Sequence, residues 1–431
     1  MKRIVNGRVI DPSTGIDGEF DVWIESGKIR AVDRPGSFDS VGTPEAVETF
    51  DARGKMIVPG LIDVHVHLRE PGFEHKETIA SGTRAAVLGG FTSVACMANT
   101  LPVNDHPLIT RAILEKARAA GQARVFPIGA VTKGQKGEEL AEIGLMAREG
   151  ICAISDDGMP VMNSALMRRA MEYAQMFDLP VISHAEDLNL SSGCPMSEGP
   201  VSSLLGLSGN PNASEEIMVA REVSLCRLTR ARVHIAHLST CEGLEVVKRA
   251  KEAGLPITAE VTPHHLLLNQ KSWITCAHPH ERANHKMAPP LRSERDQEAL
   301  LEALNSGLID MVASDHAPHG CVDKEVEIEM AANGILGLQT TVPLLLELVA
   351  QKKMSLFRAI EALTVAPARL LKLEGLGSLA SGSHADLAIL DLNETWTLNP
   401  GAVASLSANS PFAGRSFKGK VVRTLVGGEW K

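Results

Sequence analysis

The amino-acid sequence predicts an α/β protein: a (β/α)8 TIM barrel with a small β-sandwich domain built from both chain ends. Two observations predict it. Short β-rich runs alternate with amphipathic helical runs from about residue 56 onward, which is the pattern of a parallel sheet with crossover helices. Short strands with Gly and Asp turns occupy the two ends instead. The predicted division is 1–55 and 371–431 for the two parts of the small β domain, and 56–370 for the barrel.

Eight runs are candidates for the barrel strands. Helical runs at 108–121, 163–178, 241–254 and 294–307 separate several of them; Asn163 is the expected N-cap of the second, and several end at Gly. Because no repeat is visible at the residue level, the barrel rests on this count, and a miscount would leave an open doubly wound sheet. The eight runs are IVPGLIDVHVH (57–67), TSVACMANT (92–100), ARVFPIGAVT (123–132), ICAISDDG (151–158), LPVISHAED (179–187), ARVHIAHLS (231–239), LPITAEVTPHH (255–265) and LIDMVASDHAP (308–318).

The two chain ends are too short to fold alone. Residues 1–55 and 371–431 each lack enough apolar sequence for a core of their own, so we expect them to pack together as one small β domain. The barrel would then be inserted between the two halves of that domain.

Composition narrows the class of protein. Hydrophobic residues make up 44% of the 431 residues and charged residues 22%, which are ordinary globular values. The net charge of -9 argues against nucleic-acid binding, because neutralising phosphates requires a basic face. Seven cysteines without a C-x-x-C pair indicate reduced thiols. No apolar leader and no apolar run of about 18 residues is visible. We therefore expect a cytoplasmic protein that binds no membrane.

Polar residues follow five of the predicted barrel strands. In a TIM barrel, the residues that carry chemistry lie at the C-terminal ends of the strands. In the run GLIDVHVHLRE (60–70), strand alternation would point both histidines and the arginine to one face. The joint occurrence at one rim indicates a site rather than unrelated polar residues. The strand-end residues are His65 and His67, Asp156 and Asp157, His184, His237, and Asp315 with His316 and His319.

The donor types predict metal chemistry. Four imidazoles and two carboxylates without a thiolate suit Zn²⁺, Mn²⁺, Co²⁺ or Fe²⁺, and they are too many for one tetrahedral ion with an open position. Two metals that share a bridging carboxylate fit better, although spacing alone does not separate Asp156 from Asp157 as the bridge. Such a pair supplies a nucleophile for hydrolysing or forming an amide bond. A nearby carboxylate, for which we choose Asp315, would move the proton.

Several motifs together resemble one family. The runs PGLIDVHVHLREPG, SDDG, SHAED, HIAHLST, APPLR and ASDHAPH resemble the amidohydrolase superfamily and, most closely, its bacterial type I dihydroorotases, over nearly the whole chain. The resemblance implies two Zn²⁺ per chain with Asp157 as the bridge. It implies His65, His67, Asp157 and Asp315 as ligands of one ion, and Asp157, His184 and His237 as ligands of the other.

The resemblance also implies a substrate: N-carbamoyl-L-aspartate, cyclised reversibly to L-dihydroorotate and water in de novo pyrimidine (UMP) biosynthesis. Dihydroorotate carries a carboxylate, which Arg69 can bind in a bidentate manner with help from Asn99. His319 matches a substrate-binding histidine of the family, and the backbone around Asn333 and Gly334 matches a segment that contacts the ring.

The sequence departs from the family at two positions. Ala98 stands before Asn99 where the family has proline, which we interpret as a backbone adjustment. Ala288 stands before a double proline where the family has asparagine, so an expected substrate contact is missing there.

Two other functions remain open. A hydantoinase or allantoinase would share the barrel and the reaction type, but those enzymes bridge their metals with a carboxylated lysine, whereas Lys133 and Lys136 look like solvated loop charges. A catalytically silent subunit that scaffolds aspartate carbamoyltransferase would be expected to lose metal ligands, and all six are present. The family also suggests a complex of the active enzyme with that transferase, and we expect a homo-oligomer.

Overall fold

The computed structural model describes residues 1–37, 47–276 and 279–431, so residues 38–46 of the predicted N-terminal part lie outside the described residues. Eight parallel strands form the barrel sheet, in the order of the chain. These strands are β6 (Leu61–Val66), β7 (Phe91–Cys96), β8 (Arg124–Gly129), β9 (Ala153–Ile154), β10 (Val181–Ser183), β13 (Val233–Ile235), β14 (Ile257–Val261) and β15 (Met311–Val312).

The barrel closes between its first and last strands. The backbone N–H of His67 donates to the carbonyl of His316 over 2.8 Å, and Val66 pairs with His316 in a parallel bridge. The open doubly wound sheet is therefore excluded, and the predicted barrel is confirmed.

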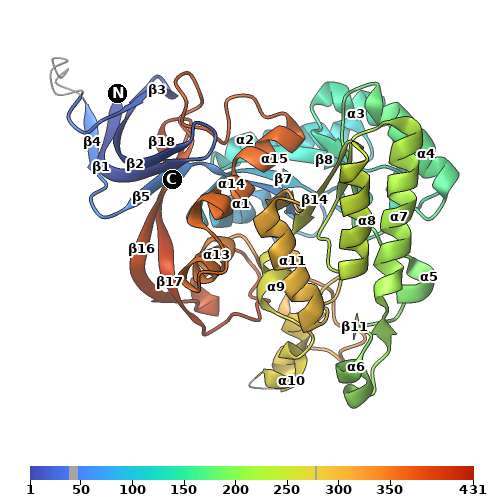
Figure 1. Ribbon diagram of the computed structural model, residues 1–431. Coiled ribbons are helices and arrows are strands. Elements are labelled where there is room, and N and C mark those ends of the chain that lie inside the picture. Colours follow the sequence, from blue (N-terminus) through green and yellow to red (C-terminus); the bar gives the residue numbers. More distant parts are fainter. Residues whose placement is uncertain (38–46, 277–278) are drawn as a thin grey trace.

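Helices surround the barrel sheet. The longest, α7, and the helices α4, α8 and α11 stand side by side on one side of the barrel in Figure 1. The helices are α1 (Ile79–Leu88), α2 (Pro107–Ala120), α3 (Ile143–Glu149), α4 (Ser164–Gln175), α5 (Leu188–Ser191), α6 (Pro200–Leu205), α7 (Asn212–Thr229), α8 (Cys241–Glu252), α9 (Pro263–Leu267), α10 (Ser272–Thr275), α11 (Glu294–Ser306), α12 (Cys321–Lys324), α13 (Thr341–Ala350), α14 (Leu356–Leu363) and α15 (Val365–Leu371). Among the described residues, 3₁₀ turns span Lys133–Gln135, Pro279–His285 and Pro400–Ala402.

Strands from both chain ends form one outer sheet, with the N- and C-termini beside it (Figure 1). Apolar residues of β2 and β17, which are not neighbours in this sheet, share one buried core, so the sheet curls around its own apolar residues. Its strands are β1 (Lys2–Asp11), β2 (Ile16–Glu25), β3 (Lys28–Asp33), β4 (Glu48–Asp51), β5 (Met56–Pro59), β16 (Leu387–Thr397), β17 (Ser416–Val426) and β18 (Glu429–Trp430). A separate short pair consists of β11 (Met196–Ser197) and β12 (Gly209–Asn210).

One predicted strand is two strands. The run 57–67 was expected to be a single barrel strand, but β5 pairs with β1 and β16 of the outer sheet, whereas β6 pairs with β7 of the barrel. The chain changes sheets at Gly60. A Cβ atom there would lie 2.2 Å from Oγ1 of Thr92, so glycine allows the close approach to β7.

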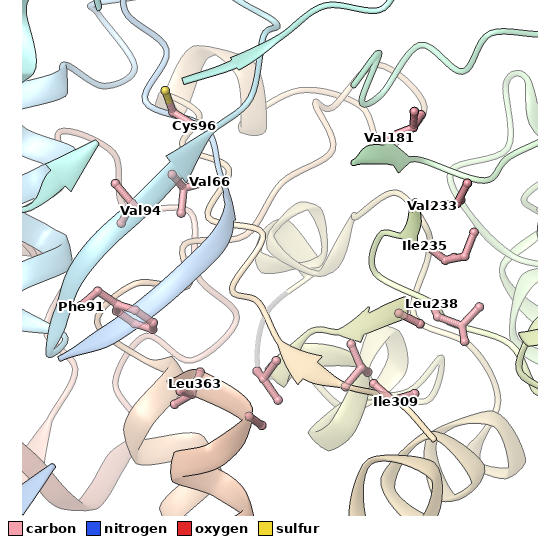
Figure 2. Close-up of a cluster of buried hydrophobic side chains, with 14 of the residues drawn as sticks. Val66, Phe91, Val94, Cys96, Val181, Val233, Ile235, Leu238, Ile309 and Leu363 are labelled. Carbon is pink, nitrogen blue, oxygen red and sulfur yellow. The ribbon is translucent and has the colours of Figure 1, made fainter. Parts of the chain in front are cut away.

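Two apolar layers hold the barrel together. The larger one lies between sheet and helices; Figure 2 shows part of it, including Phe91 and Val94 of β7 and Leu363 of α14. The second lies inside the barrel, where strand residues such as Ile62 and Met311 meet Leu370 of α15. This inner layer fills the barrel below the C-terminal rim, so the rim is left for polar residues.

No helix in the described part of the chain is long and apolar enough to cross a membrane.

Candidate metal centre

The six predicted metal ligands come from five strands and meet at the C-terminal rim of the barrel. His65 lies in β6, and the others follow the ends of β6, β9, β10, β13 and β15; all six are buried. Among the described residues, two triads of these side chains have ligand atoms within 4.8 Å of one another: His65, His67 and Asp315, and His65, Asp157 and His237.

Asp157 lies between the four histidines. Its Oδ1 is 3.4 Å from Nε2 of His65, 3.4 Å from Nε2 of His237 and 3.5 Å from Nδ1 of His184. Its Oδ2 is 3.5 Å from Nε2 of His67. One carboxylate thus faces both groups of imidazoles, which is the position that a bridging ligand requires.

Asp156 faces the opposite way. Its Oδ1 accepts hydrogen bonds from the backbone N–H groups of Val131 (2.7 Å) and Thr132 (3.2 Å), and its Oδ2 accepts one from the Thr132 hydroxyl. Burial raises the pKa of Asp156 to about 6 in spite of these bonds. Asp156 therefore supports the loop after β8, and the geometry favours Asp157 at the position where spacing left both residues open.

The charges of the cluster require a cation. Burial opposes ionisation of Asp157 and Asp315, but the neighbouring histidines outweigh it and hold both pKa values below their usual range. Burial likewise opposes protonation of His184, yet Asp157 and Glu186 raise its pKa to about 10. Two buried carboxylates are thus negative, and either imidazolium protons or a metal must balance them.

The donor set fits Zn²⁺ or a similar ion. Nε2 of His65 is buried without a hydrogen-bond partner, although it lies within 3.5 Å of Asp157 and Asp315 oxygens. Nitrogen and carboxylate oxygen donors without thiolate are typical ligands of Zn²⁺ in catalytic sites. The residues therefore fit the predicted metal.

Three of the histidines are oriented by a hydrogen bond at the ring nitrogen that faces away from the cluster. The sequence analysis did not predict most of the residues that make these bonds. Glu260 Oε1 lies 2.7 Å from Nδ1 of His65, and Glu186 Oε2 lies 2.8 Å from Nε2 of His184. Asn99 Oδ1 lies 2.9 Å from Nδ1 of His67. Such bonds fix which ring nitrogen would face a bound metal. The sequence contains one signal that could have identified Glu260, because a carboxylate inside the predicted barrel strand 255–265 would be buried and would need a partner.

Three site residues have a left-handed backbone that side chains rarely adopt. The φ angles are +61° at Arg69, +32° at His237 and +47° at Asp315. This conformation is unfavourable for residues other than glycine and needs support from the surroundings. Beside Asp315, the carboxylate of Asp63 gives such support, because it accepts hydrogen bonds from the backbone N–H groups of His65 and Ser314, each over 3.1 Å.

A cavity of about 470 Å³ opens beside the cluster. Four of the five predicted substrate contacts line it: Arg69, Asn99, His319 and Asn333. Gly334 lies just behind the wall. A Cβ atom on Gly334 would be 2.5 Å from the carbonyl oxygen of Ala317 and 2.7 Å from Cδ2 of His319, so glycine lets this loop pack against His319. The departure at Ala288 also lies on the cavity wall.

The Arg69 side chain points into the cavity, but for a different reason from the predicted strand alternation. β6 ends at Val66, so strand alternation does not orient Arg69; its left-handed loop conformation does. Its Nε donates to the Pro318 carbonyl over 3.1 Å, and its Nη2 lies 3.0 Å from Nε2 of His319. Burial lowers the pKa of Arg69 to about 10, which leaves it charged at neutral pH. Burial and the Arg69 charge lower the pKa of His319 to about 2, so His319 is neutral.

The loop lysines lie away from the cluster. Lys133 is exposed and pairs with Glu139 over 2.7 Å, and Lys136 is exposed as well. Of the described residues that line the cavity, Lys286 is the one lysine, and its ammonium donates to the carbonyls of Ile328 and Glu329. None of these three lysines is at the position of a metal bridge.

Fold and site together are those of a metal-dependent hydrolase, and the comparisons give its family. The Amidohydrolase family model matches residues 56–431, so the chain belongs to the amidohydrolase family. Two curated relatives are named dihydroorotase. The protein from Anaeromyxobacter dehalogenans (strain 2CP-1 / ATCC BAA-258) is 48% identical over 425 residues, 99% of this chain and 96% of that one. The protein from Syntrophotalea carbinolica (strain DSM 2380 / NBRC 103641 / GraBd1) is 49% identical over 428 residues, 99% and 97% of the two chains.

Solved structures with similar folds carry other names. An L-hydantoinase (dihydropyrimidinase) from Arthrobacter aurescens is 26% identical, with a TM-score of 0.87 over 100% of this chain and 95% of that one. A D-hydantoinase (dihydropyrimidinase) from Thermus sp. is 24% identical, with a TM-score of 0.83 over 100% and 95%. The similarity to the Thermus enzyme concerns the fold alone. The predicted family and fold are thus confirmed.

Proposed function

We propose that the protein is a dihydroorotase, which reversibly cyclises N-carbamoyl-L-aspartate to L-dihydroorotate and water in de novo pyrimidine biosynthesis. The relatives with this name match almost the full length of the chain at close to half identity. The observation that carries the proposal is the cavity, where the Arg69 guanidinium and the cluster of carboxylates and imidazoles line one space. A substrate with a carboxylate at one end and a reacting amide at the other matches these two features.

We further propose two Zn²⁺ per chain, with His65, His67, Asp157 and Asp315 around one and Asp157, His184 and His237 around the other. The support is the arrangement of Asp157, which lies within 3.5 Å of nitrogen atoms from all four histidines. A bound metal pair would supply an activated water and polarise the amide carbonyl.

The side chains around the cavity would bind the substrate and transfer the proton. Arg69 would bind the substrate carboxylate, with Asn99, His319 and the backbone near Asn333 and Gly334 around the ring. Asp315, which is ionised, would take the proton of the attacking water and deliver it to the ring nitrogen as the amide bond breaks. In the direction of synthesis, the same carboxylate would take the proton from the attacking amide nitrogen and give it to the departing water.

A hydantoinase or allantoinase is the second candidate, and the fold similarity to the Arthrobacter aurescens enzyme favours it. Two features argue against it. An uncharged ring makes no use of the buried Arg69, and an aspartate occupies the position between the two histidine groups.

The deciding experiment is to count the metals in the purified protein by mass spectrometry and to measure the turnover of dihydroorotate, hydantoin and allantoin. We expect about two zinc ions per chain and selective turnover of dihydroorotate. A preference for the uncharged rings would move the function to the second candidate. Bound metal without any turnover would support the silent scaffolding subunit.

The predicted partners and location remain predictions from the resemblance and the composition. They are a homo-oligomer, a complex with aspartate carbamoyltransferase and a cytoplasmic location. Light scattering of the protein alone and mixed with the transferase measures the first two.

A further inference from the structure

A segment near the C-terminus leaves the outer sheet and reaches the rim of the barrel. Residues 405–410 lie between β16 and β17 and contain four buried polar residues: Ser405, Ser407, Asn409 and Ser410. The Ser407 hydroxyl donates to the carbonyl of Lys76 over 2.8 Å, and the backbone N–H of Leu406 donates to the Glu77 carboxylate over 3.2 Å. The segment is therefore fixed against the loop that leads from Arg69 to α1.

Asn409 connects this segment to two further loops. Its Nδ2 donates to the carbonyls of Ala317 (2.9 Å) and Gly334 (3.0 Å), and its Oδ1 accepts from the backbone N–H of His319 (3.0 Å). Asn409 is 4% exposed. A side-chain amide offers two N–H donors and one oxygen acceptor, and all three parts are used here.

The partners of Asn409 carry the substrate side of the cavity. His319 lines the cavity, and Asn333, which also lines it, immediately precedes Gly334. Arg69 donates to the Pro318 carbonyl and lies 3.0 Å from the His319 ring, so the loop 317–319 also sets where the guanidinium points. One buried amide thus fixes the spacing between the loop of His319 and the loop of Asn333, and indirectly the direction of Arg69.

We propose that Asn409 is a positioning residue for the part of the cavity that binds the substrate carboxylate. This inference rests on the proposed function. None of the hydrogen bonds of the Asn409 side chain goes to one of the six candidate metal ligands. Its loss should therefore affect substrate binding more than metal binding or the chemical step. Asparagine is required because aspartate lacks the two donors and alanine lacks all three bonding atoms.

The test compares Asn409→Ala and Asn409→Asp with a matched control, Thr424→Val. Thr424 is buried in β17, in the same C-terminal part of the chain, and its hydroxyl donates to the Val87 carbonyl over 2.5 Å, away from the cavity. For each protein, KM and kcat for dihydroorotate, the zinc content and the thermal midpoint are measured. Hydrogen exchange is followed in segments 315–320 and 332–337.

We expect both Asn409 variants to raise KM about tenfold or more, with kcat within about threefold and unchanged zinc, since loss of ground-state positioning raises KM. Exchange should become faster in both segments. Thr424→Val should lower the thermal midpoint and leave KM unchanged. If the Asn409 variants only lower the midpoint, as the control does, the inference is overturned. Absence of turnover by the unsubstituted protein would overturn the proposed function instead, and the exchange data would still decide whether Asn409 holds the two loops.

Discussion

Asp156 and Asp157 are neighbours in the chain, yet their carboxylates face opposite sides of the loop after β9. Asp156 accepts backbone hydrogen bonds from Val131 and Thr132, and Asp157 faces the four histidines. The difference follows from the tertiary partners of each carboxylate, which are backbone N–H groups of the loop after β8 for Asp156 and the histidines of the barrel rim for Asp157. At the residue scale, the role of an aspartate at this rim therefore depends on where its carboxylate points as well as on its residue type.

Asp315→Asn should abolish turnover while the fold is kept. The amide has the shape of the carboxylate but cannot take up the proton, and loss of an acid–base group typically lowers kcat by about 10² to 10⁴-fold. Steady-state kinetics and a thermal scan measure both effects. The control is Asp310→Asn, because Asp310 precedes β15, at its other end, and pairs with Lys251 over 2.6 Å. Near-normal kcat in Asp315→Asn would contradict its assignment.

Arg69→Met should raise KM for dihydroorotate by the equivalent of about 2 to 4 kcal/mol, because a charge-assisted bidentate pair is lost. KM for an uncharged hydantoin serves as the internal control, since that ring offers no carboxylate. Equal changes for both substrates would remove the carboxylate-binding role from Arg69.

At the scale of single elements, helix ends follow local rules. The predicted N-cap of the helix in 163–178 is confirmed: α4 begins at Ser164, and Asn163 Oδ1 accepts from the backbone N–H groups of Ala165 (3.0 Å) and Leu166 (3.2 Å). These bonds lie within three residues, so the sequence contains all the information that they need.

Asn163→Ala should lower the free energy of unfolding by about 1 kcal/mol, because two backbone N–H groups of the first turn lose their acceptor. Urea unfolding measures the change. Asn163→Ser keeps a capping oxygen and should cost clearly less, and equal losses in the two variants would show that capping is not the cause.

The short helix α12 contributes a buried lysine beside the cavity. Lys324 Nζ donates to the carbonyls of Ala283 (2.9 Å) and Ala332 (2.8 Å) and so joins two of the segments around the cavity. Burial, with Lys286 nearby, lowers the pKa of Lys324 to about 7. The unfolded chain has the ordinary value of 10.5.

The contribution of Lys324 to the free energy of unfolding should therefore increase as the pH rises above 7. Below pH 7, folded and unfolded chains both hold the proton, and the cost of burying the charge is fully present. Between pH 7 and 10.5 the unfolded chain binds more protons, so the free energy of unfolding rises by up to about 1.4 kcal/mol per pH unit. Relative to Lys324→Met, the unsubstituted protein should gain about 2 kcal/mol from pH 7 to pH 9 in urea unfolding. A constant difference between the two proteins would refute this.

At the scale of the whole molecule, the candidate metal centre joins strands from the entire length of the barrel. Its candidate ligands run from His65 to Asp315, and the inner apolar layer contains residues in or directly after the same strands, such as Ile62, Ala153 and Met311. A metal at this rim would cross-link elements that no covalent bond connects.

Removal of the metal with a chelator should lower the thermal midpoint and abolish turnover, and added Zn²⁺ should restore both. A ligand at a hundred times its dissociation constant stabilises the folded state by about 2.7 kcal/mol. Asp157→Ala is the control, because without the bridge its midpoint should respond much less to chelator. A midpoint that chelator leaves unchanged in the unsubstituted protein would contradict a metal centre at the rim.

The sequence by itself determined the barrel, the N-cap of α4 and the types of residue at the strand ends, because apolar periodicity and capping are local properties. The sequence pattern wrongly predicted one strand where the structure has β5 and β6. The change of sheet at Gly60 depends on the close approach of Thr92, which lies 32 positions further along the chain. Only the tertiary structure decided which way Asp156 faces and how Arg69 reaches the cavity. It also brought Glu260 to His65 and Asn409 to His319, 195 and 90 positions apart, because packing rather than local pattern creates such contacts.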